Sequence, residues 1–160
     1  MPEPRTSTFD AKQQQISEDV LRATVIDLID LSLIAKQARW NVIDRDLDPI
    51  QAALDELVSV VRRFTDAATG RAAALGFSND GQVVTVVEDS GALALPDGWQ
   101  LGNAVVEAIV DNLTIVIARL RGRTQATRTS DPATRDLLVG IAARLEQLRW
   151  MWQAQLAMAA

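Results

Sequence analysis

A chain of 160 residues is long enough to fold as one domain with a proper core, and we expect a single domain over residues 1–160. It contains no His and no Cys, which excludes disulfides, thiolate catalysis, zinc–thiolate sites and histidine acid–base chemistry. The formal net charge of −5 opposes a general nucleic-acid-binding surface, which normally needs a basic patch.

The N-terminal region predicts neither secretion nor membrane insertion. Residues 1–5 lack a basic segment followed by an apolar one, which predicts a cytoplasmic protein. No apolar run in the chain approaches the ~18–20 residues of a membrane span. We expect residues 1–16 to form a flexible N-terminal tail.

Two long helices are predicted in the first half of the chain. Apolar residues recur at helical spacing from about Ser17 to Trp40, and Ser17 is a reasonable start. For the second helix, Asp48 is the expected N-cap and Pro49 suits the first helical position. This helix is expected to continue to Leu75, where Gly76 stops it.

The second half of the chain predicts a long connection and two more helices. Residues 77–98 contain two turn sequences, and residues 82–87 between them have the β-branched composition of a strand. A third helix is expected over about 100–127, and a fourth begins with Asp131 as N-cap and Pro132 behind it. Two helix pairs joined by one long crossover predict an all-α four-helix bundle.

The run Lys36-Gln37-Ala38-Arg39-Trp40-Asn41-Val42, followed by Gln51, Asp55, Asp66 and Gly70, resembles the segment that carries the di-iron centre of Dps proteins. Dps, the "DNA-binding protein from starved cells", is a branch of the ferritin-like family. The resemblance extends from Ser17 to Leu156 and implies a ferritin-like bundle in a dodecameric cage that stores iron. It also implies a short helix in the crossover, in place of the strand that local composition favours.

The same resemblance implies that the ferroxidase centre is degenerate. The family has histidines at the positions of Arg39 and Gln51, carboxylates at Asp55 and Asp66, and a glutamate at Gly70. Arginine is cationic and has no lone pair, glutamine offers one weak carbonyl oxygen, and glycine offers nothing. We therefore expect ferrous oxidation to be absent or much reduced, with weak metal binding at most by Asp55 and Asp66. Iron would be held weakly or as mineral only.

Three interpretations of Arg39 follow. The family places the positions of Arg39, Gln51 and Asp55 on one subunit and those of Asp66 and Gly70 on its two-fold mate. The guanidinium would then replace the metal as the charge between carboxylates of two subunits. The alternatives are that Arg39 points to solvent beside ordinary surface acids, or that the two aspartates still bind metal weakly.

Two aspartates and three tryptophans each allow a structural or a functional interpretation. Asp131 and Asp136 match positions that line the family's acidic three-fold pores, although an N-cap role explains Asp131 equally well. Trp40 matches a tryptophan beside the family's centre, or packs at a helix end. Trp150 and Trp152 are expected in core and interface packing.

The predicted function is a cage subunit for iron storage or sequestration and stress protection. The alternative is a structural or DNA-interacting cage subunit with no iron chemistry. The chain shows no lysine-rich terminus of the kind through which family members often bind DNA. Its notable basic group is Arg121, Arg123 and Arg128, at the end of a predicted helix, where cations are favoured in any case. An active ferroxidase with relocated ligands would have to use carboxylates alone, because the chain has no His.

Overall fold

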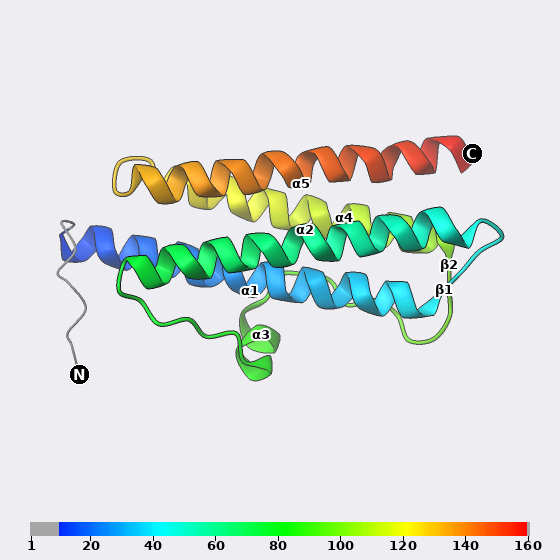
Figure 1. The fold of residues 1–160 in the computed structure, drawn as a ribbon, viewed down its shortest axis with the longest axis horizontal. Helices are drawn as coiled ribbons and strands as arrows, with labels where there is room; N and C mark the ends of the chain where they lie inside the picture. Colours follow the sequence, from blue (N-terminus) through cyan, green and yellow to red (C-terminus); the bar gives the residue numbers. More distant parts are fainter. Residues whose placement is uncertain (1–9, 160) are drawn as a thin grey trace.

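The computed structural model describes residues 10–159, and in them the all-α four-helix bundle predicted from the sequence is confirmed. The four long helices lie side by side, and one short helix lies outside the bundle on the crossover (Figure 1). The elements in chain order are α1 (Ala11–Asn41), β1 (Val42–Ile43), α2 (Leu47–Ala74), α3 (Val83–Asp89), β2 (Gln100–Leu101), α4 (Gly102–Ala126) and α5 (Pro132–Ala159).

The first helix begins six residues before the predicted start at Ser17. Asp10 accepts a hydrogen bond from the Gln13 backbone, and the Gln13 side chain accepts one from the Asp10 backbone, which forms a capping box. Ser17 lies inside the helix, fully buried. The prediction of a flexible tail is therefore wrong for residues 11–16, and residues 1–9 lie outside the described part.

The second helix begins after Asp46, so the prediction of Asp48 as its N-cap is wrong. Asp48 instead adds a negative charge to the first turn, where the helix dipole favours it. The other end is as predicted, because Gly76 adopts φ 90° beyond the last turn. The backbone N–H of Phe77 then donates to the Ala72 carbonyl over 2.9 Å, closing the helix in the usual way.

The crossover contains α3 where local composition predicted a strand, so the strand over residues 82–87 is wrong. Asp80 accepts hydrogen bonds from the Gln82 backbone (3.0 Å) and the Thr85 hydroxyl (2.8 Å), and these two bonds lower its pKa. They organise the first turn of the helix. Thr85 and Val86 are buried, whereas Val83 and Val87 on the other side of α3 are more than three-quarters exposed.

The core fills the space between the four long helices. Leucine, isoleucine and valine side chains from all four helices pack into one cluster, with Trp152 of α5 only 1% exposed within it. This confirms core packing for Trp152, whereas Trp150 is 68% exposed. No helix in residues 10–159 is both long enough and apolar enough to cross a membrane.

A buried ionic cluster ties α1, α4 and the crossover together. Asp27 is 1% exposed, and its carboxylate accepts hydrogen bonds from Arg119 (2.8 Å), Arg123 (2.6 Å) and the backbone N–H of Gly91 (3.2 Å). A Cβ at Gly91 would lie 2.6–2.8 Å from the Arg119 guanidinium, so glycine permits this approach. The cluster fixes the path of the crossover against the bundle.

Candidate functional site

The Dps-like positions on α1 and α2 form an ion cluster around Asp55. The Arg39 Nε donates to one carboxylate oxygen over 3.1 Å, and the Lys36 Nζ donates to the other over 3.1 Å. Lys36 and Arg39 are three residues apart on α1, so they lie on one face of that helix. The hydrogen bond from Arg39, followed by that from Lys36, lowers the pKa of Asp55. The Asp55 carboxylate is therefore already satisfied by two cations of its own chain.

The interpretation of Arg39 as a residue pointing to solvent is thus wrong within the subunit. Its side chain is 30% exposed and its guanidinium is directed at Asp55. Lys36 has no role in the site predicted from the sequence, although it completes the cluster around Asp55. The available signal was the i, i+3 spacing of two cations facing an acid on the next helix.

The remaining positions on α2 are more open. Gln51 lies one turn before Asp55 and is half-buried, while Asp66 and Gly70 are exposed. A Cβ at Gly70 would meet no atom within 4 Å, so neither backbone conformation nor crowding requires glycine there. Asp66 forms no ion pair with any side chain in the described residues.

These side chains do not fit a di-iron centre of the family's kind. Iron needs several oxygen and nitrogen donors with free lone pairs, and here the nearest carboxylate already binds an ammonium and a guanidinium. Among the described side chains, no group of three or more acids is placed to share a metal ion. The local charge of Lys36, Arg39 and Asp55 together is positive, which repels a cation.

The two aspartates matched to the family's pores occupy different environments. Asp131 is fully buried, accepts a hydrogen bond from the backbone of Thr134 (3.1 Å) as the N-cap of α5, and pairs with Arg71 over 2.8 Å. Ser17 donates to the same carboxylate over 3.1 Å. These contacts favour the cap for Asp131. Asp136, with a side chain 76% exposed, keeps a carboxylate that faces solvent.

The basic group at the end of α4 is not the exposed patch that its sequence suggests. Arg123 is 9% exposed and binds Asp27, and burial lowers its pKa. Arg121 pairs with Glu146 over 2.6 Å. Two of the three guanidiniums are therefore already paired within the chain, which weakens the case for DNA binding at this end.

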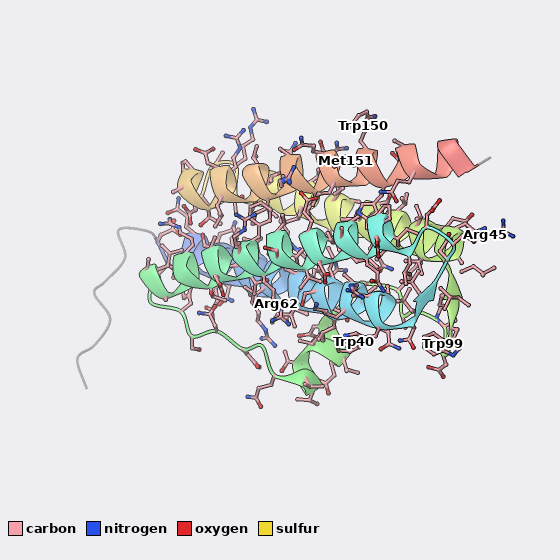
Figure 2. The ribbon with its side chains drawn as sticks, turned by 45° about the vertical axis from the view of Figure 1, so that its right-hand side comes forward. Trp40, Arg45, Arg62, Trp99, Trp150 and Met151 are labelled. Carbon is pink, nitrogen blue, oxygen red and sulfur yellow. The ribbon has the colours of Figure 1, made fainter. Side chains whose placement is uncertain are left out.

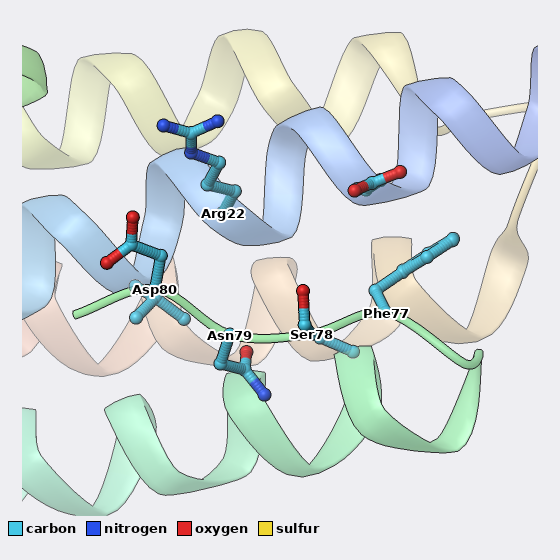
Figure 3. A pocket seen from close by; sticks show the side chains of 8 residues that line it. Arg22, Phe77, Ser78, Asn79 and Asp80 are labelled. Atoms are coloured by element: carbon cyan, nitrogen blue, oxygen red, sulfur yellow. The ribbon is translucent and has the colours of Figure 1, made fainter. Parts of the chain in front are cut away.

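A small cavity between α1, α2 and the start of the crossover is too small for a ligand. Figure 3 shows Arg22, Phe77, Ser78, Asn79 and Asp80 among its lining residues. Its volume is about 20 Å³, which accommodates a single water molecule. The candidate site remains the ion cluster of Lys36, Arg39 and Asp55 on the surface of α1 and α2.

Comparisons with known proteins agree with the fold and with the segment on which the site lies. The family model described as "Ferritin-like domain" matches residues 18–159. The chain is 28% identical to "DNA protection during starvation protein 2" of Deinococcus radiodurans over 94% of its own length and 61% of that protein's. It is 30% identical to the "Fine tangled pili major subunit" of Haemophilus ducreyi, over 86% of this chain and 73% of that one.

The chain thus spans about three-fifths of the length of the Deinococcus relative. Among solved structures, the Dps of Microbacterium arborescens in its "high iron form" superposes with a TM-score of 0.88 at 26% identity, covering 95% of this chain and 99% of that one. The fold, the family match over most of the chain and the Dps relatives lead to one assignment. The chain belongs to the ferritin-like domain family, in its Dps branch.

Proposed function

We propose that this protein is a Dps-like cage subunit for iron storage and stress protection that has lost the family's ferroxidase centre. Membership of the Dps branch supports the cage and the iron cargo. The main support for the loss of the ferroxidase centre is the pairing of Asp55 with both Lys36 and Arg39. Ferrous iron would meet a local positive charge where active relatives offer ligands.

The chain's own residues then serve storage without rapid oxidation. Exposed acids such as Asp136 attract ferrous ions electrostatically, and slow oxidation by dissolved oxygen deposits mineral inside the cage. Asp66, exposed and without an ion pair in the described residues, is a further weak attraction for cations. Iron is cargo in this proposal and is not a resident cofactor.

We expect ferrous iron to oxidise little faster with this protein than in buffer. The assay follows ferric absorbance after addition of ferrous salt, with and without peroxide, in protein and buffer samples. The variant Arg39→His/Gln51→His/Gly70→Glu is the matched positive control, because it restores the three missing donors. A saturable rate in the parent far above buffer would contradict the proposal and would mean that other ligands act.

We expect a hollow homo-oligomer of the Dps kind. The large exposed apolar side chains lie on different sides of the chain: Figure 2 shows Trp150 and Met151 on α5, away from Trp40 and Trp99. A single isologous contact covers one patch only, so burying these separate patches takes more than one kind of contact, as a closed assembly supplies. Multi-angle light scattering and electron microscopy measure its size. A stable monomer at micromolar concentration would rule out the cage.

A further inference from the structure

The crossover between α2 and α4 is attached to the bundle less firmly than the four long helices are to one another. Residues 77–97 run beside α1 outside the bundle, with α3 in the middle of this path (Figure 1). We call residues 77–97 the strap. The structure describes all of them, and among them only Thr85 and Val86 are buried, while Ala92 and Leu95 pack partly buried against the main core. Little apolar area therefore holds the strap, because hydrophobic stabilisation follows the area removed from water.

A glycine with positive φ lies at each end of the strap. Within residues 10–159, positive φ occurs only at Gly76 (φ 90°) and Gly98 (φ 83°). Gly76 lies just beyond α2, and Gly98 ends the turn that precedes β2. Glycine also adopts negative φ at little steric cost, so the backbone can change direction at both points while the helices beyond them stay in place. Both ends of the strap are therefore suited to act as hinges.

Most polar contacts between the bundle and the strap cost little to break. Asp27 would lose only its hydrogen bond from the strap backbone (3.2 Å) and would keep both of its arginines. Asp30 accepts a hydrogen bond from the Ser90 hydroxyl over 2.5 Å, but Asp30 is only half-buried, so water can replace that bond. Arg22 and Asp89 form an ion pair with both side chains about half exposed, and such surface pairs contribute little to stability.

Asn112 of α4 makes the strap contact that is hardest to replace. Asn112 is 1% exposed, and its carboxamide bonds the Leu93 backbone in both directions: Oδ1 accepts from the N–H over 2.7 Å, and Nδ2 donates to the carbonyl over 3.1 Å. Nδ2 also donates to the Ala108 carbonyl over 3.0 Å, and this bond lies within α4. Oδ1 has no other partner in the described part of the chain. Opening the strap would leave this buried oxygen without a hydrogen bond, which is costly.

We propose that the strap opens away from α1 as one unit about Gly76 and Gly98 while the four long helices stay folded, and that Asn112 latches it closed. Segments with few buried apolar contacts open at a lower free energy than a helical core does. Opening removes one wall of a groove of about 590 Å³ between α1 and the strap. It exposes apolar side chains of α1 that line this groove, such as Ile34, which is buried in the closed form. The strap thus controls access to an apolar surface of α1, and this inference does not depend on the proposed iron storage.

Thiol labelling tests whether the strap opens independently. The chain contains no Cys, so one engineered thiol reports opening at a chosen place. Val86→Cys places the thiol on the buried side of α3, and the matched control Val60→Cys places it in the bundle core, where Val60 is equally buried. In the assembled protein, a thiol reagent should label Val86→Cys about a hundredfold faster than Val60→Cys, since local opening requires less free energy than global unfolding. Equal rates would mean that the strap opens only when the subunit unfolds, and would overturn the proposal.

A second substitution in each labelled variant tests the latch. Asn112→Ala should raise the labelling rate of Val86→Cys about tenfold, because it removes hydrogen bonds that exist only in the closed form. The control is Ile141→Val in the core of α5, across the bundle from the strap (Figure 1). It should speed the labelling of Val60→Cys but not that of Val86→Cys, because the bundle stays folded when the strap opens. An unchanged Val86→Cys rate in Asn112→Ala would show that Asn112 is not the latch.

Gly98→Ala tests the hinge. A Cβ at Gly98 meets no atom within 4 Å, so alanine adds only the strain of positive φ to the closed strap. Rotation at this residue on opening relieves the strain, so the labelling rate of Val86→Cys should rise roughly tenfold. Gly122→Ala in α4 also has open space around its Cβ and should leave this rate unchanged. Equal rates in the two alanine variants would place the hinge elsewhere.

Hydrogen exchange of the unaltered protein makes the comparison without any substitution. Mass spectrometry should show that peptides from residues 77–97 exchange together and ahead of peptides from the four long helices. Exchange of the strap in step with the long helices would overturn the proposal.

Discussion

Replacing Asp27 by asparagine should lower the free energy of unfolding by about 3–5 kcal/mol, the usual cost of removing one partner of a buried ion pair. The change leaves the buried guanidinium of Arg123 without its carboxylate and removes the charge that holds Arg119. It also weakens the acceptor for the Gly91 N–H, so the crossover loses a contact with α1.

The matched control is Asp89→Asn. Asp89 pairs with Arg22 over 3.2 Å, but both side chains are about half exposed, so the expected loss is below about 1 kcal/mol. Urea denaturation of both variants at one fixed protein concentration measures the difference, because assembly adds to apparent stability. Equal losses in the two variants would mean that the buried cluster contributes no more than a surface pair.

Replacing Asp131 by alanine should lower the free energy of unfolding by about 2.5–4 kcal/mol. The loss combines an N-cap, about 1 kcal/mol, with hydrogen bonds to a buried carboxylate, about 1.5–3 kcal/mol. Ser17, Arg71 and Thr134 all lose their acceptor at once. The matched control is Asp136→Ala, five residues on and exposed, which should change stability by less than about 0.5 kcal/mol.

The same two variants test whether each aspartate caps a helix or lines a pore. Asp136→Ala should slow iron uptake into the assembled protein if it lines an entry route, whereas Asp131→Ala should affect uptake only through stability.

Burial alone would raise the pKa of Asp131, but hydrogen bonds from Thr134 and the charge of Arg71 outweigh it and lower the pKa. Its contribution is thus complete above the ordinary carboxyl pKa of 3.8 and is lost as the pH falls through the lowered pKa.

Thermal melts between pH 7 and pH 2.5 measure this contribution. The parent should lose stability steeply below about pH 4, and Asp131→Asn should be less stable at neutral pH but flatter with falling pH. A variant whose melting temperature falls in parallel with that of the parent would show that this carboxylate does not govern acid stability.

The sequence by itself determined the four long helices and their approximate ends. Helical apolar spacing, Gly76 beyond α2, and Asp131 followed by Pro132 before α5 are local signals, because each depends on backbone geometry within a few residues. The missing metal ligands at Arg39, Gln51 and Gly70 could also be predicted from the sequence, because the residue type determines whether a side chain can donate a lone pair to a metal.

Only the tertiary structure decided which residues of different helices contact one another. The valines of α3 favour a strand, but Asp80 accepts a hydrogen bond from the Thr85 hydroxyl, and Thr85 and Val86 are buried against the bundle, so tertiary contacts override local preference. Lys36 joins Arg39 at Asp55, and Arg123 turns inward to Asp27, because residues distant in sequence meet across helices. Ion pairs between helices depend on the distance between side chains in the folded protein, and the spacing of residues along one helix does not determine that distance.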